Sequence, residues 1–149
     1  MKVKNSIFKT RIRSASGFTL LELLIVISII GILVAIGVAA YSSAQLKARN
    51  SRRMQDIKAL TSAAEQYFAA NNSNYPTQVQ LTVPDFLPGG WPKDPKTSVN
   101  YPYVLTGTST YCTCALLEGS NIGNSNAAAD ATCSGLGNPG NYYCARNMQ

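Results

Sequence analysis

Apolar side chains dominate one long segment near the start of the chain, residues 18–41. These 24 residues include a single side chain that is charged at neutral pH, Glu22. A helix rises about 1.5 Å per residue, so this segment would reach roughly 36 Å, which is enough to cross a bilayer. The pattern therefore predicts a membrane-spanning helix over residues 18–41.

The next segment, residues 42–74, is more polar but keeps a helical repeat. Its apolar residues recur at a spacing close to that of one helix face, and no Gly or Pro interrupts residues 42–71. They are Leu46, Met54, Ile57, Leu60, Ala64, Tyr67 and Phe68. We expect the spanning helix to continue through this amphipathic segment and to end in the Asn- and Ser-rich residues 71–74.

The remaining residues, 75–149, predict a small head of short strands and long loops. Pro and Gly are frequent over residues 75–111, where residues 101–105 and 110–117 have strand composition and flank a short hairpin connection. Residues 118–141 are rich in Gly, Ser, Asn and Ala, which predicts a long surface loop. The predicted fold class is α+β, with a long N-terminal helix followed by a head of antiparallel strands.

Charge is concentrated at the N-terminus. The formal charge of +6 includes five cations before residue 18, and the rest of the chain carries 8 basic against 7 acidic residues. The five are Lys2, Lys4, Lys9, Arg11 and Arg13. Without this piece the chain is almost neutral, so its basic character is no argument for nucleic-acid binding. The chain has no His and shows no nucleophile paired with a base, so we expect neither an enzyme nor a cofactor.

Residues 1–17 have the basic character of an export leader. The apolar run that follows is too long for an ordinary secretory signal peptide. Gly17 is a small residue directly before that run, so cleavage after Gly17 would remove the charged leader and keep the helix. The alternative is an uncleaved signal anchor in which Gly17 is a flexible joint.

Glu22 requires compensation, because a carboxylate inside a spanning segment costs on the order of 2.5–3.5 kcal/mol. No cation lies in the segment. Cleavage after Gly17 would create an amine on Phe18, and a small axial shift between parallel helices would bring that amine to the Glu22 carboxylate of a neighbouring chain. The pattern predicts self-assembly, with Phe18, Thr19 and Glu22 setting the register. The alternatives are that Glu22 is protonated or reaches the headgroups.

The sequence GFTLLELLIVI, which begins at Gly17, resembles the class III signal of type IV pilins and type II secretion pseudopilins, and the resemblance continues to Tyr41. It rests on the basic leader, on Gly before an aromatic residue, and on Glu at the fifth position after Gly17. The resemblance implies cleavage between Gly17 and Phe18 by a prepilin peptidase, N-methylation of Phe18 and packing of the helix into a filament core. It also implies that Glu22 pairs with the amine of a neighbouring subunit.

This resemblance implies a structural subunit of a type IV pilus-like filament. The implied partners are copies of the same chain, the prepilin peptidase, an inner-membrane assembly platform and the lipid bilayer before assembly. The subunit would first lie in the cytoplasmic membrane with its head outside the cytoplasm, and later in an extracellular filament. The alternatives are a major pseudopilin of a type II secretion system and a subunit of a DNA-uptake pilus.

The sequence departs from the pilin pattern at Ala39, where pilins commonly have a Pro and the helix loosens in the filament. Gly37 could weaken the helix nearby, by about 1 kcal/mol relative to Ala. An unkinked helix is the alternative.

A second basic cluster follows the spanning segment: Lys47, Arg49, Arg52, Arg53 and Lys58. One interpretation is a solvated helix face on which Arg52 pairs with Asp56, four residues later. Another is contact between subunits or with anionic headgroups, and a third is non-specific DNA binding along a filament. The candidate contacts for phosphates or headgroups are Lys47, Arg49, Arg52 and Arg53.

Four cysteines predict two disulfides in an exported head. Cys112 and Cys114 would lie on the same face of a strand and are poorly placed to bridge each other, so each should pair with Cys133 or Cys144. Two connectivities therefore remain open. The alternatives are free or intermolecular thiols and a zinc site, although the chain lacks the paired C-x2-C spacing and the His that zinc sites commonly use.

Asp130 is the candidate calcium ligand, because the resemblance to major pseudopilins implies a calcium site in the C-terminal loops. Carboxylates are sparse there, since Glu118 and Asp130 are the only two after Asp94. We therefore expect no metal site.

Overall fold

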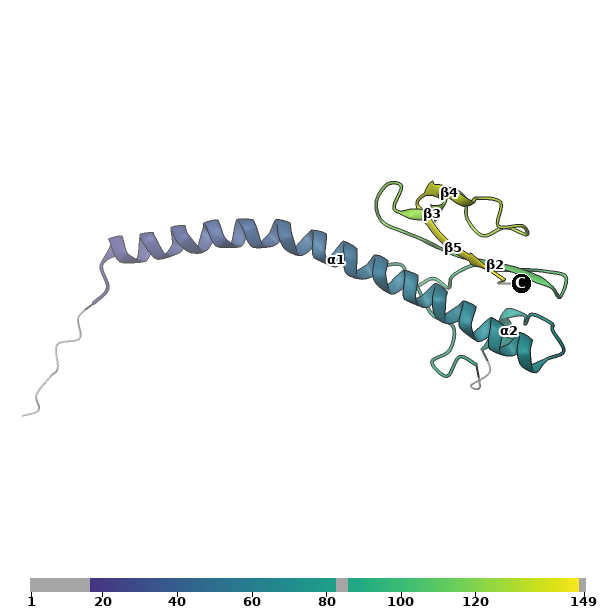
Figure 1. Cartoon of the computed structure of the whole chain (residues 1–149). Helices are drawn as coiled ribbons and strands as arrows, with labels where there is room; N and C mark the ends of the chain where they lie inside the picture. The colour runs from purple at the N-terminus through teal and green to yellow at the C-terminus, as the bar shows by residue number, and fades with distance from the viewer. Residues whose placement is uncertain (1–16, 83–85, 148–149) are drawn as a thin grey trace, which may run out of the picture. The chain divides into compact units, whose positions relative to one another are not determined.

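The computed structural model describes residues 17–82 and 86–147 (Figure 1). The chain divides into two units, Met1–Ala40 and Tyr41–Gln149. In chain order the elements are α1 (Leu20–Ala70), α2 (Gln78–Leu81), β1 (Tyr103–Thr106), β2 (Thr110–Leu116), β3 (Gly123–Ser125), β4 (Leu136–Gly140) and β5 (Tyr142–Arg146). Helix α1 contributes residues 20–40 to the first unit and residues 41–70 to the second.

In the first unit, α1 presents apolar side chains that are not covered by the described protein. Each large apolar side chain from Leu20 to Val38 is at least 47% exposed. Among the described residues, α1 is the one helix long and apolar enough to cross a membrane, and none of its most apolar 18-residue window is buried. Helical backbone continues through Gly37 and Ala39.

In the second unit, α1 packs on a five-stranded antiparallel sheet with the strand order β1-β2-β5-β3-β4. The apolar stripe of the helix includes Ile57, Leu60 and Ala64, which are fully buried. These residues form one core with Tyr111 and Ala115 of β2. The predicted α+β fold is therefore confirmed, with the helical stripe burying the face of the sheet that carries the aromatic side chains.

Helix α1 ends where the Asn- and Ser-rich run begins. Asn72 and Ser73 adopt left-handed backbone conformations, with φ of 52° and 59°. The N–H of Ser73 donates to the carbonyl oxygen of Phe68 at 3.2 Å, which satisfies one of the last carbonyls of the helix. The four-residue α2 was not predicted; a capping box between Thr77 and Gln80 begins it.

The predicted hairpin is confirmed as β1 and β2, with small shifts at its ends. Strand β1 begins at Tyr103, directly after Pro102, because proline has no N–H to donate to a ladder. The four register pairs of the hairpin run from Tyr103 opposite Thr113 to Thr106 opposite Thr110.

The prediction of one long surface loop over residues 118–141 is wrong. This stretch contains β3 and β4, and three of its five glycines, Gly123, Gly135 and Gly140, lie where another backbone segment comes very close. A Cβ on Gly123 would lie 2.0 Å from the carbonyl oxygen of Tyr142, and one on Gly140 would lie 2.4 Å from that of Ser125. Here glycine permits close packing of strands, and its frequency does not indicate irregular backbone.

Strand β2 also explains the disulfides, because alternate residues of a strand point to opposite sides. Cys112 and Cys114 lie on the face away from the aromatic core, in a separate buried cluster. Cys114 lies opposite Cys144 in the strand register and bonds to it, while Cys112 bonds to Cys133. The two predicted disulfides are confirmed, and the structure selects one of the two connectivities that the sequence left open.

We predict that only the native cysteine pairs oxidise efficiently. A digest of the wild-type protein cannot separate Cys112 from Cys114, so paired variants are required. The variant Cys112→Ala with Cys133→Ala should keep a disulfide between Cys114 and Cys144, because those residues face each other in the sheet. Mass spectrometry of the unreduced, alkylated protein measures the linked peptides.

The matched control for this prediction is Cys114→Ala with Cys133→Ala, which leaves Cys112 and Cys144. These two residues are not opposite each other in the strand register, so they should be recovered as alkylated thiols. A quantitative disulfide in this control would contradict the connectivity.

Candidate functional site

The first unit begins with a reciprocal capping box between Thr19 and Glu22. Glu22 Oε2 accepts from the backbone N–H of Thr19 at 2.9 Å and from its hydroxyl at 2.8 Å. The Thr19 hydroxyl oxygen accepts from the backbone N–H of Glu22 at 3.2 Å. This arrangement begins α1 by satisfying N–H groups that have no partner within the helix. Compensation for Glu22 is therefore partly local, and sequence reasoning missed the contribution of Thr19 because it considered only charged partners.

Gly17 and Phe18 lie just before the helix. The Phe18 side chain is 89% exposed, and a Cβ on Gly17 would meet nothing within 4 Å. The predicted cleavage point is therefore non-helical backbone open to an enzyme. The predicted leader lies outside the described residues except for Gly17.

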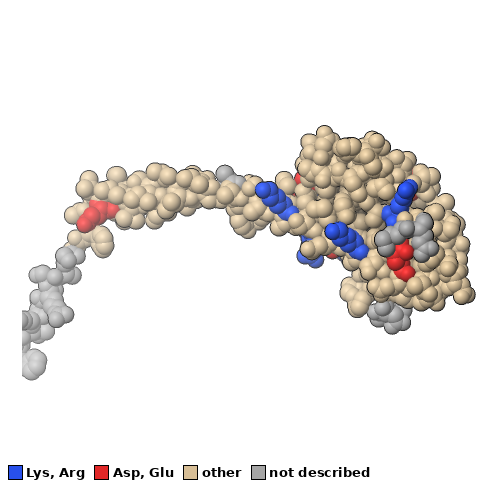
Figure 2. Space-filling view, in the orientation of Figure 1, with Lys and Arg blue, Asp and Glu red and all other residues tan. Residues whose placement is uncertain are grey.

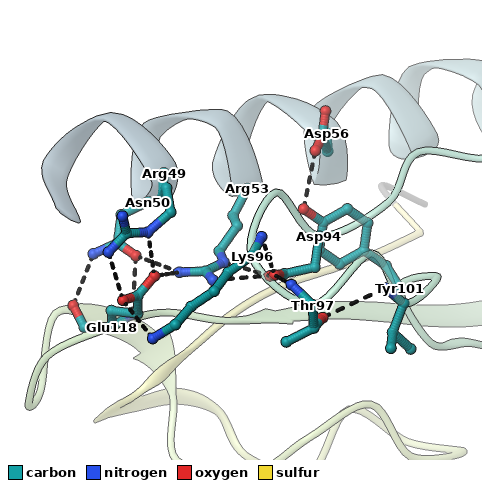
Figure 3. Close-up of polar contacts among 10 residues, drawn as sticks. Arg49, Asn50, Arg53, Asp56, Asp94, Lys96, Thr97, Tyr101 and Glu118 are labelled. Carbon is teal, nitrogen blue, oxygen red and sulfur yellow. Dashed lines mark hydrogen bonds and ion pairs between the residues drawn. The ribbon is translucent and has the colours of Figure 1, made fainter. Parts of the chain in front are cut away.

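In the second unit, a cluster of ion pairs joins α1 to two distant segments of the chain. Arg53 is at its centre, with a side chain that is only 3% exposed. Its Nε donates to Asp94 Oδ2 at 2.5 Å, and its Nη1 donates to Glu118 Oε1 at 2.8 Å and to Asn50 Oδ1 at 3.0 Å. Figure 3 shows these side chains extending from the helix to the loops beside it.

Glu118 is held from several directions. Arg49 binds it through two parallel hydrogen bonds, from Nε at 2.7 Å and from Nη2 at 2.8 Å, and Lys96 Nζ adds a third at 3.1 Å. The side chain of Asn50 donates to the Glu118 carbonyl oxygen and accepts from its N–H. Hydrogen bonds between a guanidinium and a carboxylate in this geometry are stronger than those between neutral groups, and they fix the orientation of both side chains.

The Asp94 carboxylate also shapes the loop that carries it. Asp94 Oδ1 accepts the backbone N–H groups of Lys96 at 2.8 Å and Thr97 at 2.9 Å. The Tyr101 hydroxyl donates to Asp56 on α1 at 2.9 Å. The cluster thus fastens this loop and the end of β2 to the helix. Its chemistry is structural, because its carboxylates are occupied by cations and N–H groups.

Charge pairing sets the protonation of these groups. The hydrogen bond from Arg53, together with the N–H groups of Thr97 and Lys96, holds the pKa of Asp94 far below its ordinary value of 3.8. The hydrogen bond from Arg49, followed by those from Lys96 and Arg53, holds the pKa of Glu118 far below 4.5. Burial and then the hydrogen bond to Asp56 raise the pKa of Tyr101. Both carboxylates are therefore ionised at neutral pH.

The structure divides the basic residues that the sequence grouped together. Arg49 and Arg53 point into the cluster, whereas Lys47, Arg52 and Lys58 are exposed. The pair that was expected between Arg52 and Asp56 is not among the ion pairs of the described residues, and Asp56 accepts from Tyr101 instead. All Lys and Arg side chains of the described residues belong to the second unit (Figure 2).

Asp130, the candidate calcium ligand, shapes the turn before Cys133. Its carboxylate accepts from the backbone N–H of Thr132 at 2.8 Å and from that of Ser134 at 3.1 Å, and also from both of their hydroxyls. No group of three metal-binding side chains occurs within residues 17–82 and 86–147.

Sequence reasoning missed Asp94, Glu118 and Asn50 as members of a site. A weak signal was available, because Arg49 and Arg53 are four residues apart and share the helix side that carries the core stripe. Their acidic partners lie at least 41 residues away along the chain, so only the fold shows which carboxylates they meet.

The chain is similar in sequence to several known proteins. A family profile described as "Prokaryotic N-terminal methylation motif" matches residues 12–38. The chain is 34% identical over 112 residues to the type II secretion system core protein G of Vibrio cholerae, covering 65% of this chain and 75% of that protein. It is 40% identical over 83 residues to the protein of the same name from Klebsiella michiganensis, covering 52% and 58%. It is 42% identical over 53 residues to a fimbrial protein of Pseudomonas aeruginosa, covering 36% and 34%.

These findings define the class of the molecule. The long apolar helix, the N-terminal motif and the small antiparallel head are those of a filament-type subunit, and the chain belongs to the family of type IV pilins and type II secretion pseudopilins. The matched region spans 58% and 47% of the length of two of the curated relatives. No solved structure matches the chain.

We predict that replacing Asp94 with Asn destabilises the second unit at neutral pH by about 3–5 kcal/mol, because buried Arg53 would lose a charged partner. The folded-state pKa of Asp94 lies below the ordinary 3.8, so this stability is complete above that pH and declines as the pH falls through lower values. The difference between wild type and Asp94→Asn should therefore shrink below about pH 4. Denaturant unfolding followed by Trp91 fluorescence measures it.

The matched control for Asp94→Asn is Asp56→Asn, whose amide oxygen can still accept from Tyr101. It should cost less than Asp94→Asn at neutral pH. An Asp94→Asn cost that is equal at pH 3 and pH 7 would show that charge pairing with Arg53 does not stabilise the head.

Proposed function

We propose that this chain is the repeating subunit of a type IV pilus-like filament. It is made as a membrane-inserted precursor, cleaved after Gly17, N-methylated at Phe18 and polymerised through the apolar part of α1. The observation that carries the proposal is one carboxylate, Glu22, in the part of α1 up to Ala40, which is otherwise uncharged and uncovered and directly follows a Gly17–Phe18 bond in open backbone.

Uncovered apolar surface supports two successive states of the subunit, a membrane-inserted precursor and a subunit packed in a filament. Side chains such as Leu21, Ile30 and Ile36 are 52–69% exposed, and water disfavours such surface by about 25 cal/mol per Å². Lipid would cover it in the precursor, and the helices of other subunits would cover it in a filament. The chain is therefore its own expected principal partner.

The amine of Phe18 and the carboxylate of Glu22 support a specific register. Thr19 binds Glu22 through hydrogen bonds from uncharged donors, so the negative charge is stabilised but not balanced. A cation from an adjacent chain would balance it in low dielectric, and only one axial stagger would bring the two groups together. The proposed contact thus selects both the partner and the step between subunits.

Two further observations support location and partners. The paired cysteines favour an oxidising compartment for the head, which supports a position outside the cytoplasm. Removal of residues 1–17 requires a prepilin peptidase on the cytoplasmic side, and extraction of the helix from lipid requires an inner-membrane assembly platform. Both partners belong to the proposal.

A second candidate function is a pseudopilin of a type II secretion system. The match to the Vibrio cholerae protein extends over 112 residues, against 53 for the Pseudomonas aeruginosa fimbrial protein. The longer match favours this alternative for the head. Deletion of the gene separates the two functions, since loss of surface filaments supports the pilus and retention of exported proteins in the cell supports the pseudopilus.

We predict that processing occurs after Gly17. Replacing Gly17 with Leu should leave an uncut precursor, because the peptidase would meet a bulky side chain at the cleavage point. Intact mass of the purified subunit measures leader removal and the added methyl group together. The control Gly31→Ala changes a glycine inside the spanning segment and should be processed like wild type; normal cleavage of Gly17→Leu would count against the assignment.

We predict that Glu22→Leu inserts in the membrane, is cleaved and fails to assemble. Leucine suits lipid better than a carboxylate, but it cannot pair with the amine of a neighbour. Membrane level, leader removal and the yield of sheared filament are compared with wild type. Ser28→Ala removes another polar group from the same segment and should assemble normally.

Two results would overturn this prediction. Filaments of normal yield from Glu22→Leu would show that register is set elsewhere. Loss of membrane insertion would show that Glu22 acts before assembly.

A further inference from the structure

The second unit has an apolar surface next to the end of the predicted spanning segment. We call it the foot and define it as Leu46 and Lys47 on α1 together with residues 119–122. Ile122 is 49% exposed, and residues 119–121 are exposed as well. Leu46, Met54, Leu117 and Ile122 line a groove of about 450 Å³ at this surface.

Two of the polar side chains that line the groove, Asn50 and Glu118, are already bonded within the head. The Asn50 side chain is bonded to the backbone of Glu118, and the Glu118 carboxylate is bonded to Arg49, Arg53 and Lys96. What the foot still offers is apolar surface, from Leu46 and Ile122, and the charge of Lys47. A partner that fits it combines apolar groups with negative charge.

Two cations of this part of α1 lack an acidic partner among the described residues. They are Lys47 and Arg52, both exposed, whereas Arg49 and Arg53 in the same stretch are paired with carboxylates. Lys47 lines the groove of the foot and Arg52 does not, because Arg52 points about 140° away from Lys47 around the helix. An anionic membrane surface attracts each such side chain and loses that attraction in high salt.

The position of the foot along α1 indicates which molecule it meets. Leu46 follows Tyr41, the last residue of the predicted spanning segment, by five residues, or about 7.5 Å of helix. Lys47 is thus within about one Debye length of the interface that Tyr41 would occupy. The short helical distance from Tyr41 favours a membrane surface as the partner of the foot.

We propose that, before assembly, the foot rests on the anionic phospholipid surface of the membrane, with Ile122 in the interface and with Lys47 near the lipid phosphates. This inference rests on the membrane-inserted stage of the proposed function. It gives the head a preferred orientation in the bilayer and makes release of the foot a step of filament assembly. Binding of nucleic-acid phosphate is the competing use of the same cation.

The test uses the full mature chain in vesicles of phosphatidylcholine alone or of phosphatidylcholine with phosphatidylglycerol. A Cys at position 122 (Ile122→Cys) carries an environment-sensitive fluorophore, since the native cysteines are paired. Quenching by brominated lipid measures contact of the foot with the bilayer. We expect quenching in the anionic vesicles, weaker quenching in the neutral ones, and a loss of the difference in high salt.

Variants identify the groups responsible. Lys47→Gln should lower the ratio of membrane-bound to free foot about fivefold in anionic vesicles. Arg52→Gln removes an equal charge outside the groove and should lower the ratio less. Lys93→Gln is the matched control, because it removes an exposed lysine of the 91–100 loop and should leave the ratio unchanged. A fluorophore on Val79→Cys, at an exposed position of α2, should stay unquenched in every vesicle.

Three outcomes would overturn the inference. The first is equal quenching at position 122 in both lipids, or none. The second is unchanged quenching in Lys47→Gln while binding of duplex DNA to the same vesicles falls, which assigns this cation to DNA. The third is failure of the chain to float with the vesicles, a separate readout that overturns the membrane stage itself and this inference with it.

Discussion

The constraint on which the rest of the molecule depends is that α1 has more apolar surface than this chain covers. In the second unit its stripe is buried against the sheet, with Ile57, Leu60 and Ala64 at zero exposure. In the first unit every large apolar side chain from Leu20 to Val38 is open. One helix thus obeys two patterns, a stripe where the protein supplies the cover and apolar side chains on all sides where another phase or another molecule must supply it. Folding of the chain covers only the apolar stripe of the second unit.

How far the sequence predicts the structure follows from this division. Periodicity along α1 predicts the spanning segment, the stripe and the Asn-rich end, because each depends on neighbours in the chain. The pairing of Cys112 with Cys133 and the partners of Arg53 depend on strand register and on contacts across at least 21 residues, which no local pattern encodes. The error over residues 118–141 has a similar origin. Gly123 looks like a loop residue in the sequence, but its lack of a Cβ is what allows the backbone of Tyr142 to approach.

The head is held together differently on its two sides. On one face of β2, Cys112 and Cys114 form disulfides, which restrict the unfolded chain and need little apolar surface. On the side of α1, Arg53 binds two segments that are distant in the sequence, the loop at Asp94 and the end of β2 at Glu118. A small head with a limited core benefits from both devices. Because a buried ion pair is weak evidence for net stability, the main effect of Arg53 is to specify where these segments lie.

Arg53 and Glu22 are two charges on the same helix, and only the charge of Arg53 is neutralised within the folded chain. Arg53 is nearly inaccessible, and carboxylates 41 and 65 residues away neutralise it within the folded chain. Glu22 receives only the amide and hydroxyl of Thr19, and among the described residues no cation lies within 4.0 Å of it. Hydrogen bonds orient a carboxylate, but they do not cancel its charge, and transfer to a low-dielectric surrounding therefore remains costly. A charge that folding neutralises specifies the fold, while a charge that folding leaves unbalanced inside an uncovered apolar helix favours the arrival of a second molecule with the opposite charge. An unpaired charge is costly in a low-dielectric surrounding at both positions. At residue 53 this cost favours a contact within the folded chain, and at residue 22 it favours assembly with another chain.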